Sequence, residues 1–207
     1  VDAHYLLEAG VIGDLRVSME QIASHATVAH ADFSAKLRTV IEAVAIEYAD
    51  DDGYPIKPQK ILWDVRQVMG AEDVLLSDVG AHKMWIARHY QCHEPNTCLI
   101  PNGFCSMGFA LPGAISAAMV YPDRRTLAIC GDAGFLMNVQ EMETASRMNS
   151  DITVMVWEDG GYGLISWKQD NEFNRHTNLS FTNPDWLKLA DAFGWHGQYV
   201  ANARALK

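Results

Sequence analysis

Two turns that combine an acidic residue with glycines are the part of this sequence best suited to chemistry. Residues 131–134 read Gly-Asp-Ala-Gly and residues 158–161 read Glu-Asp-Gly-Gly. Each turn follows a short apolar run of the kind that forms a strand buried on both faces. Ligands of open parallel sheets bind beyond the carboxyl ends of the strands. We therefore predict that Asp132 and Asp159 face one crevice.

The residue types in these turns suit a metal-bridged diphosphate. The carboxylates of Asp132 and Asp159, with a backbone carbonyl two residues further on, supply oxygens to a hard cation such as Mg2+, which completes its coordination with phosphate oxygens and water. Gly131, Gly134 and the start of the following helix can bring backbone N–H groups against an anion. The sequence contains neither GxGxxG nor GxxxxGKS/T, the usual dinucleotide and triphosphate motifs. Helix capping by the two aspartates is the alternative that these residues leave open.

The elements that must position these turns alternate between strand and helix. Strands and helices are distinguished by the spacing at which apolar residues recur along the sequence. The predicted strands are residues 74–78, 126–130, 152–157 and 197–200. The predicted helices are residues 58–68, 84–90, 108–120, 135–148, 164–173 and 185–193. This alternation predicts an α/β fold, in which a mainly parallel sheet carries helices on both faces.

The N-terminal part of the chain is predicted to lie outside this α/β domain. Residues 1–24 hold a strand-like segment at 10–14 and a short helical pattern, and we interpret them as the remnant of a preceding domain. Residues 25–57 are predicted to form a helical linker. The α/β domain takes residues 58–207, and we expect it to be truncated because the sequence stops at what resembles the opening of a helix.

Composition narrows the class of protein. With 49% hydrophobic residues among 207, the chain can bury a sizeable core. The net charge of −10 and the lack of a Lys/Arg-rich block argue against a nucleic-acid surface. No apolar run approaches the ~18 to 20 residues that cross a membrane. No CxxC pair is present, so we expect free thiols and a reducing cytoplasmic location; the cysteines are Cys92, Cys98, Cys105 and Cys130.

The spacing of the two turns resembles the cofactor-binding motif of thiamine diphosphate enzymes. In that family the motif runs from Gly-Asp-Gly to Asn-Asn, and here Asp159 follows Asp132 by 27 residues. The sequence departs from the family pattern at three positions. Ala133 replaces the usual second glycine, and Glu158 and Asp159 replace the two asparagines. Asp159 retains an oxygen ligand, whereas nothing in the sequence explains Glu158.

Longer stretches resemble acetolactate synthase, especially its catabolic, FAD-independent branch. They are residues 77–85, 102–114 and 142–145, and the similarity extends over nearly the whole chain. The resemblance implies decarboxylation of pyruvate and condensation of the resulting carbanion with a second 2-oxo acid. It also implies a homo-oligomer in which the activating glutamate comes from the N-terminal pyrimidine-binding domain of a partner subunit. No catalytic residue is therefore assigned in this chain, which we expect to be inactive alone.

The resemblance assigns roles to individual residues. Asp132, Asp159 and the carbonyl of Gly161 correspond to Mg2+ ligands. His82 corresponds to a phosphate donor, Met107 to the residue that props the bent cofactor, and the carbonyl of Cys105 to the acceptor of its 4′-amino group. The full set implied to bind thiamine diphosphate is His82, Cys105, Met107, Gly131, Asp132, Ala133, Gly134, Asp159, Gly161 and Tyr162.

A substrate pocket is implied by the residues that follow the second turn. They are Leu164, Ile165, Trp167 and Lys168, the last of which stands where relatives commonly carry Gln or Trp. The ammonium of Lys168 could attract a substrate carboxylate or point to solvent. Two alternatives to acetolactate synthesis remain at this point. One is another thiamine diphosphate-dependent 2-oxo acid decarboxylase or aldehyde lyase, and the other is a non-catalytic cofactor-binding module.

Overall fold

Two units make up the chain in the computed structural model, which describes residues 9–27 and 31–206, the side chains of 31–34 and 45 excepted. Internal contacts divide the chain into Val1–Ala43 and Val44–Lys207. The first unit contains helix α1 (Leu15–His25), and helix α2 (Ala31–Ile46) crosses the division. Nothing tests the domain boundaries predicted at residues 24 and 57, which stay predictions.

The strand-like segment at residues 10–14 does not become a strand. The carboxylate of Asp14 instead caps α1 by accepting the N–H of Val17 at 3.0 Å. Only two apolar residues stand between Gly10 and Gly13. So short a segment needs a paired neighbour to form a strand.

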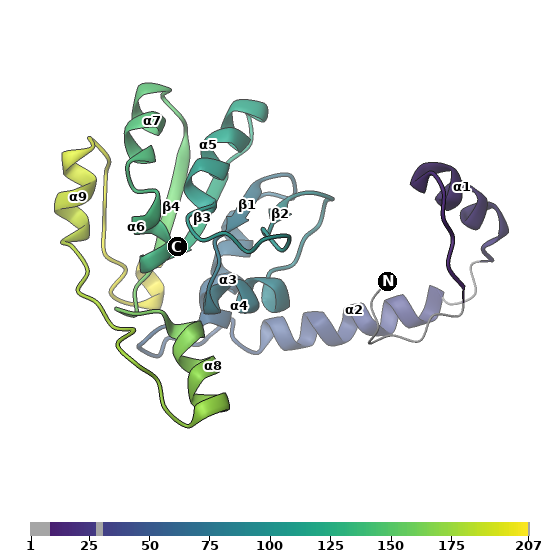
Figure 1. The fold of residues 1–207 in the computed structure, drawn as a ribbon, viewed down its shortest axis with the longest axis horizontal. Coiled ribbons are helices and arrows are strands. Elements are labelled where there is room, and N and C mark those ends of the chain that lie inside the picture. The colour runs from purple at the N-terminus through teal and green to yellow at the C-terminus, as the bar shows by residue number, and fades with distance from the viewer. Residues whose placement is uncertain (1–8, 28–30, 207) are drawn as a thin grey trace. The chain divides into compact units, whose positions relative to one another are not determined.

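A four-stranded parallel sheet forms the centre of the second unit (Figure 1). Its strands are β1 (Val74–Ser77), β2 (Cys98–Leu99), β3 (Thr126–Gly131) and β4 (Ile152–Trp157), and they lie in the order β2-β1-β3-β4. The chain moves outward from β1 to β2 and then returns past β1 to β3. The carboxyl ends of β1 and β3 therefore flank the point where the direction of winding reverses, which is where such sheets bind ligands.

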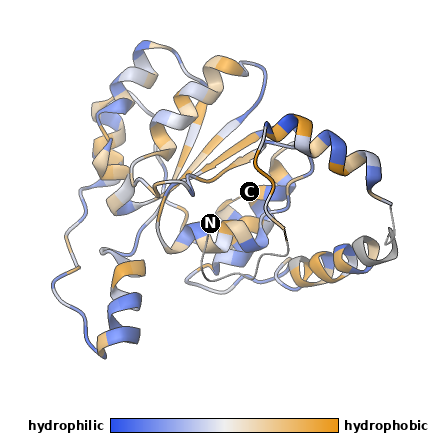
Figure 2. Cartoon of the chain, turned by 45° about the vertical axis from the view of Figure 1, so that its right-hand side comes forward, coloured by the Kyte–Doolittle hydropathy of each residue, from blue (hydrophilic) through white to orange (hydrophobic). Residues whose placement is uncertain are grey.

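Two apolar layers cover the sheet, one on each face, and Figure 2 shows the apolar residues concentrated in the strands and the adjoining helix faces. One layer joins Leu75, Leu127 and Ile129 to helices α3 (Pro58–Val68) and α4 (Ala81–His89). The other joins Val74, Leu76, Ala128 and Cys130 to helices α5 (Ala110–Val120), α6 (Asp132–Met137) and α7 (Glu141–Arg147). Successive strand residues thus alternate between the layers. The predicted fold class is confirmed.

Two predicted elements differ in the structure, and one strand was not predicted. The helix expected at residues 135–148 is two helices, α6 and α7, with a break at residues 138–140. The two-residue strand β2 lies inside what the sequence suggested was a loop, because it is too short to show a period. The strand expected at 197–200 is not formed, and these residues lie in irregular structure before the 3-10 helix η1 (Ala203–Leu206).

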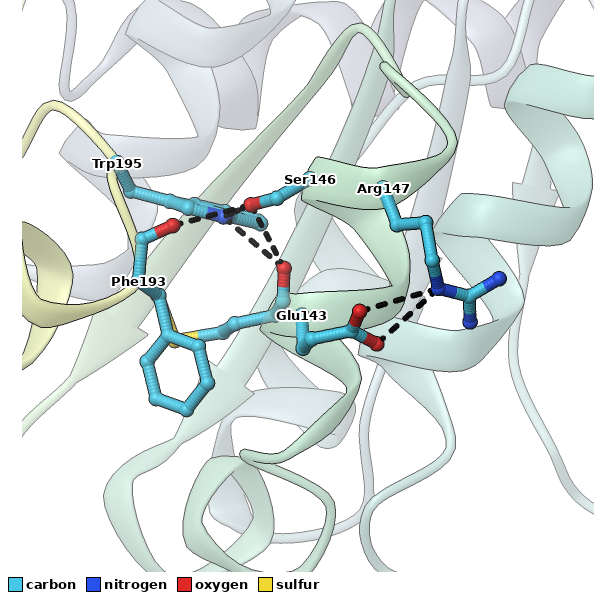
Figure 3. A network of polar contacts seen from close by, with 6 residues as sticks. Glu143, Ser146, Arg147, Phe193 and Trp195 are labelled. Carbon is cyan, nitrogen blue, oxygen red and sulfur yellow. Dashed lines mark hydrogen bonds and ion pairs between the residues drawn. The ribbon is translucent and has the colours of Figure 1, made fainter.

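Helices α8 (Gly163–Phe173) and α9 (Trp186–Ala192) follow β4. The turn after α9 is attached to α7 by hydrogen bonds (Figure 3). The indole N–H of Trp195 lies 3.2 Å from the carbonyl of Met142 and 2.9 Å from Oγ of Ser146, which donates to the carbonyl of Phe193. These bonds hold α9 beside the sheet. Within the described residues, no helix combines the length and hydropathy of a membrane span.

Candidate cofactor-binding site

The two acidic turns lie side by side at the carboxyl edge of the sheet. Strands β3 and β4 pair in parallel with Gly131 opposite Trp157, so the residues that follow each strand come together. Asp132 is the first residue of α6, and Glu158 and Asp159 follow β4 directly. The crevice predicted from the sequence is therefore present.

Asp132 is almost completely enclosed, with 1% of its surface exposed. Its Oδ1 accepts the N–H of Ala133 at 2.8 Å. Its Oδ2 accepts the N–H groups of Asp159 at 3.2 Å and Gly160 at 2.7 Å, and the side-chain amide of Asn183 at 2.8 Å. Four N–H donors compensate this carboxylate for the contacts with water that it loses on burial. Asp132 therefore ties the first turn to the second.

Asp159 has a different environment from Asp132. Its Oδ1 lies 3.3 Å from the N–H of Gly161, a long hydrogen bond. Partial burial, followed by the nearby Asp132 carboxylate, raises the pKa of Asp159. Two negative charges at one edge repel each other, and a bound divalent cation would relieve that repulsion. The residue types and their placement thus fit Mg2+.

A close contact requires glycine at position 134 of the first turn. A Cβ on Gly134 would lie 2.8 Å from Oδ1 of the buried Asp78, whereas a Cβ on Gly131 would meet Nδ1 of His82 at 3.4 Å, an ordinary van der Waals distance. Residues 132–134 of the turn begin helix α6, but that helix has only six residues. A bound anion would therefore depend on the individual N–H groups of the turn rather than on a long helix dipole. Ala133 is tolerated because its backbone needs no positive φ.

His82 lies in α4 and faces the same crevice. Its ring packs edge-on against Trp157, with 6.3 Å between ring centroids. Burial lowers the pKa of His82, against the opposing effects of the Asp78 carboxylate and a hydrogen bond with the Asp78 backbone. Its Nε2 is buried and has no hydrogen-bond partner among the described residues. A buried ring nitrogen without a partner fits the predicted contact with a phosphate oxygen.

The loop before α5 brings Cys105 and Met107 to the crevice. Cys105 has a left-handed backbone with a φ of 51°, and its N–H donates to the carbonyl of Pro101 at 3.1 Å. Asp78 fixes the end of this loop, because its carboxylate accepts the N–H groups of Gly108 at 3.0 Å and Ala110 at 2.9 Å. The position of the loop thus depends on a buried acid at the end of β1.

All ten residues predicted to bind the cofactor line one cavity of about 1040 Å3 in the second unit. Leu164 and Ile165 of the predicted substrate pocket also line it. Trp167 and Lys168 do not, and both are exposed. The cavity continues along β4 toward residues 195–200, so a cofactor would take only part of its volume.

No group of three or more His, Cys, Asp or Glu side chains suited to a metal occurs among the described residues. A site made of two carboxylates, the Gly161 carbonyl and phosphate oxygens needs no such group, because Mg2+ typically takes one or two carboxylates plus phosphate oxygens and water. The donor set therefore fits a cation that is held jointly by the protein and a diphosphate.

Sequence reasoning missed three residues of this site: Asp78, Trp157 and Asn183. Asp78 stands in one of the stretches that carried the resemblance, but nothing there marked its carboxylate as the support of a distant loop. The indole Nε1 of Trp157 is buried without a partner among the described residues and beside His82, whereas its sequence context predicted only a strand residue. Asn183 lies 51 residues from Asp132 and follows no periodic pattern, so no local signal could have found it.

Fold and crevice together define an α/β domain with a ligand site at the carboxyl edge of its parallel sheet. Residues 78–207 match the family described as thiamine pyrophosphate enzyme, C-terminal TPP binding domain. The chain belongs to this family.

Relatives in the family include several acetolactate synthases. The chain is 30% identical to the acetolactate synthase of Bacillus subtilis (strain 168), over 97% of this chain and 36% of the relative. It is 29% identical to the catabolic acetolactate synthase of Raoultella terrigena, over 100% of this chain and 38% of the relative. The chain thus spans little more than a third of the length of these relatives.

A solved structure shows the same fold. The thiamine diphosphate-dependent 4-hydroxybenzoylformate decarboxylase of Rhodococcus jostii RHA1 superimposes with a TM-score of 0.68 over 73% of this chain and 29% of that chain. The two sequences are 20% identical, so the likeness concerns the fold alone.

Proposed function

We propose that this chain holds the diphosphate end of thiamine diphosphate, through Mg2+, in an enzyme of the acetolactate synthase type. The observation that carries the proposal is the convergence of the two acidic turns, in which Asp132 accepts the N–H groups of Asp159 and Gly160. Membership of the thiamine pyrophosphate enzyme family supports the choice of cofactor.

In this proposal the residues of the crevice have distinct tasks. Asp132, Asp159 and the carbonyl of Gly161 hold the cation. The N–H groups of the first turn and a protonated Nε2 of His82 would donate to phosphate oxygens, and Tyr162 lines the cavity close by. Met107 and the carbonyl of Cys105 support and orient the cofactor from the facing loop. When bound, thiamine diphosphate supplies the electron sink for decarboxylation of a 2-oxo acid.

The activity that we propose for the complete enzyme is formation of 2-acetolactate from pyruvate or from pyruvate and another 2-oxo acid. The similarity to acetolactate synthases over nearly the whole chain supports it. Leu164 and Ile165 line the cavity and would contact the substrate. The substrate contacts expected of Trp167 and Lys168, which are exposed in α8, stay predictions.

The complete enzyme is proposed to be a cytoplasmic homo-oligomer. Because the chain spans little more than a third of its relatives, we propose that a pyrimidine-binding domain of a partner subunit supplies the activating acid. The isolated chain would then bind cofactor without turning over pyruvate. Acetolactate synthesis by the isolated chain would contradict this division of tasks.

Product analysis tests the proposed activity. The complete enzyme that contains this chain is incubated with pyruvate, Mg2+ and thiamine diphosphate, and acetolactate and acetaldehyde are quantified. We expect acetolactate as the main product and its loss in the Asp132→Ala variant. Acetaldehyde as the main product would assign a decarboxylase or lyase instead, and an enzyme that binds the cofactor but converts nothing would indicate a binding module.

A further inference from the structure

Asn183 connects the two acidic turns, although it lies in neither. Its Nδ2 donates to Oδ2 of Asp132 at 2.8 Å and to Oε1 of Glu158 at 3.0 Å. Carboxylates only accept hydrogen bonds, so the amide nitrogen, and not the amide oxygen, must face them. One side-chain amide thus bridges two carboxylates that would otherwise repel each other.

The segment that carries Asn183 is itself paired with the second turn. The N–H of Phe181 donates to the carbonyl of Gly160 at 2.9 Å, and the N–H of Tyr162 donates to the carbonyl of Leu179 at 3.0 Å. The rings of Tyr162 and Phe181 pack with centroids 5.4 Å apart. Residues 179–183 therefore run alongside residues 158–162, and we call them the strap.

The strap and the second turn together determine which oxygen of Asp132 can reach a cation. Oδ2 accepts three N–H groups, from Asp159, Gly160 and Asn183, whereas Oδ1 accepts the N–H of Ala133. A carboxylate oxygen with three donors has no lone pair directed at a further ligand. The carboxylate is therefore held with Oδ1 available.

We propose that Asn183 is a positioning residue for the cation site, acting through Asp132 and Glu158. The inference rests on the proposed function, since it assigns Asn183 to the same site. The inference also accounts for Glu158, which stands where the family pattern has Asn. Its longer side chain accepts a hydrogen bond from Asn183 and so connects the strap to the start of the second turn.

The test compares metal affinity with stability. Mn2+, which replaces Mg2+ and has an EPR signal when free, is titrated into the 207-residue chain with thiamine diphosphate present. Residues that orient metal ligands typically change metal affinity by about 10- to 100-fold when removed. We expect Asn183→Ala to weaken Mn2+ binding by that factor and Glu158→Ala to weaken it less. Asn171→Ala, at an exposed asparagine of α8, is the matched control and should leave the affinity unchanged.

Thermal unfolding of each variant separates positioning from general damage, because a positioning residue lowers the affinity while the chain remains folded at the assay temperature. If Asn183→Ala does not fold, Asn183→Ser takes its place, since serine is too short to span both carboxylates. An affinity within about twofold of the unchanged chain, for a folded variant, would overturn the inference but leave the proposed function intact. Absence of Mn2+ binding by the unchanged chain would overturn both.

Discussion

The two aspartates of the proposed cation site should affect stability in opposite directions when the metal is absent. Asp132 is buried and accepts four N–H groups, whereas Asp159 accepts one long hydrogen bond beside the charge of Asp132. Asp132→Asn and Asp159→Asn make the same chemical change at the two positions. If both residues served only as ligands, neither change would destabilise the metal-free chain.

The expected loss at Asp132 follows from its hydrogen bonds. An Asn side chain has one acceptor oxygen, and if that oxygen keeps the three donors now on Oδ2, the new NH2 group faces the N–H of Ala133. A buried donor left without an acceptor costs about 1–3 kcal/mol. The three remaining hydrogen bonds are also weakened, because their acceptor becomes a neutral amide oxygen instead of a charged carboxylate oxygen. Together these changes predict a loss of about 3 kcal/mol, which corresponds to a fall in Tm of about 6–12 °C for a chain of this size.

At Asp159 the same substitution is expected to change the stability in the opposite direction. Partial burial and the Asp132 carboxylate raise the pKa of Asp159, so ionisation is less favourable in the folded chain than in the unfolded one. A neutral side chain removes that penalty above the ordinary pKa of an aspartate, and Asp159→Asn should be as stable as the unchanged chain or more stable at pH 7.

The assay is thermal unfolding by circular dichroism in EDTA, followed by the same scan with Mg2+ and thiamine diphosphate. We expect Asp132→Asn to unfold well below the unchanged chain and Asp159→Asn at or above it. Added Mg2+ and cofactor should raise the Tm of the unchanged chain and of neither variant. Equal losses for the two variants in EDTA would refute the reasoning, because they would mean that the hydrogen bonds to Asp132 do not distinguish the two acids.

Three further changes test other parts of the site. Burial lowers the pKa of His82, so below about pH 6.5 the unfolded chain binds more protons than the folded chain, and the free energy of unfolding should fall as the pH drops. Urea unfolding of His82→Gln at several pH values should show a smaller fall. Gly134→Ala places a Cβ 2.8 Å from Oδ1 of Asp78 and should cost about 1–3 kcal/mol in the same assay, whereas Gly103→Ala, with open space around it, should cost little. Trp157→Phe removes a buried N–H without a partner among the described residues and should be neutral or stabilising by about 1 kcal/mol.

The fold class and the crevice could be predicted because their signals are local. Short apolar runs such as residues 126–130 and 152–157 showed the strands, and the acidic residues directly after them had to meet once the strands paired in parallel. Local signals also misled. Residues 135–148 keep a helical period through the break at 138–140, so the pattern did not show that α6 and α7 are separate.

The supports of the site could not be predicted, since they depend on contacts between distant residues. Asp78 fixes the loop of Cys105 and Met107 through N–H groups 30 and 32 residues away. Asn183 reaches Asp132 across 51 residues. Neither contact follows a period or a motif, so only the folded arrangement shows which polar residues hold the crevice together.

Binding of the cofactor itself tests the central claim most directly. Thiamine diphosphate is titrated into the chain in a calorimeter with Mg2+ and again with EDTA, and thiamine without its diphosphate is titrated as the matched ligand. The account predicts saturable binding that requires Mg2+ and the diphosphate and is lost in Asp132→Ala. Absence of binding with Mg2+, or equal binding in EDTA, would contradict it.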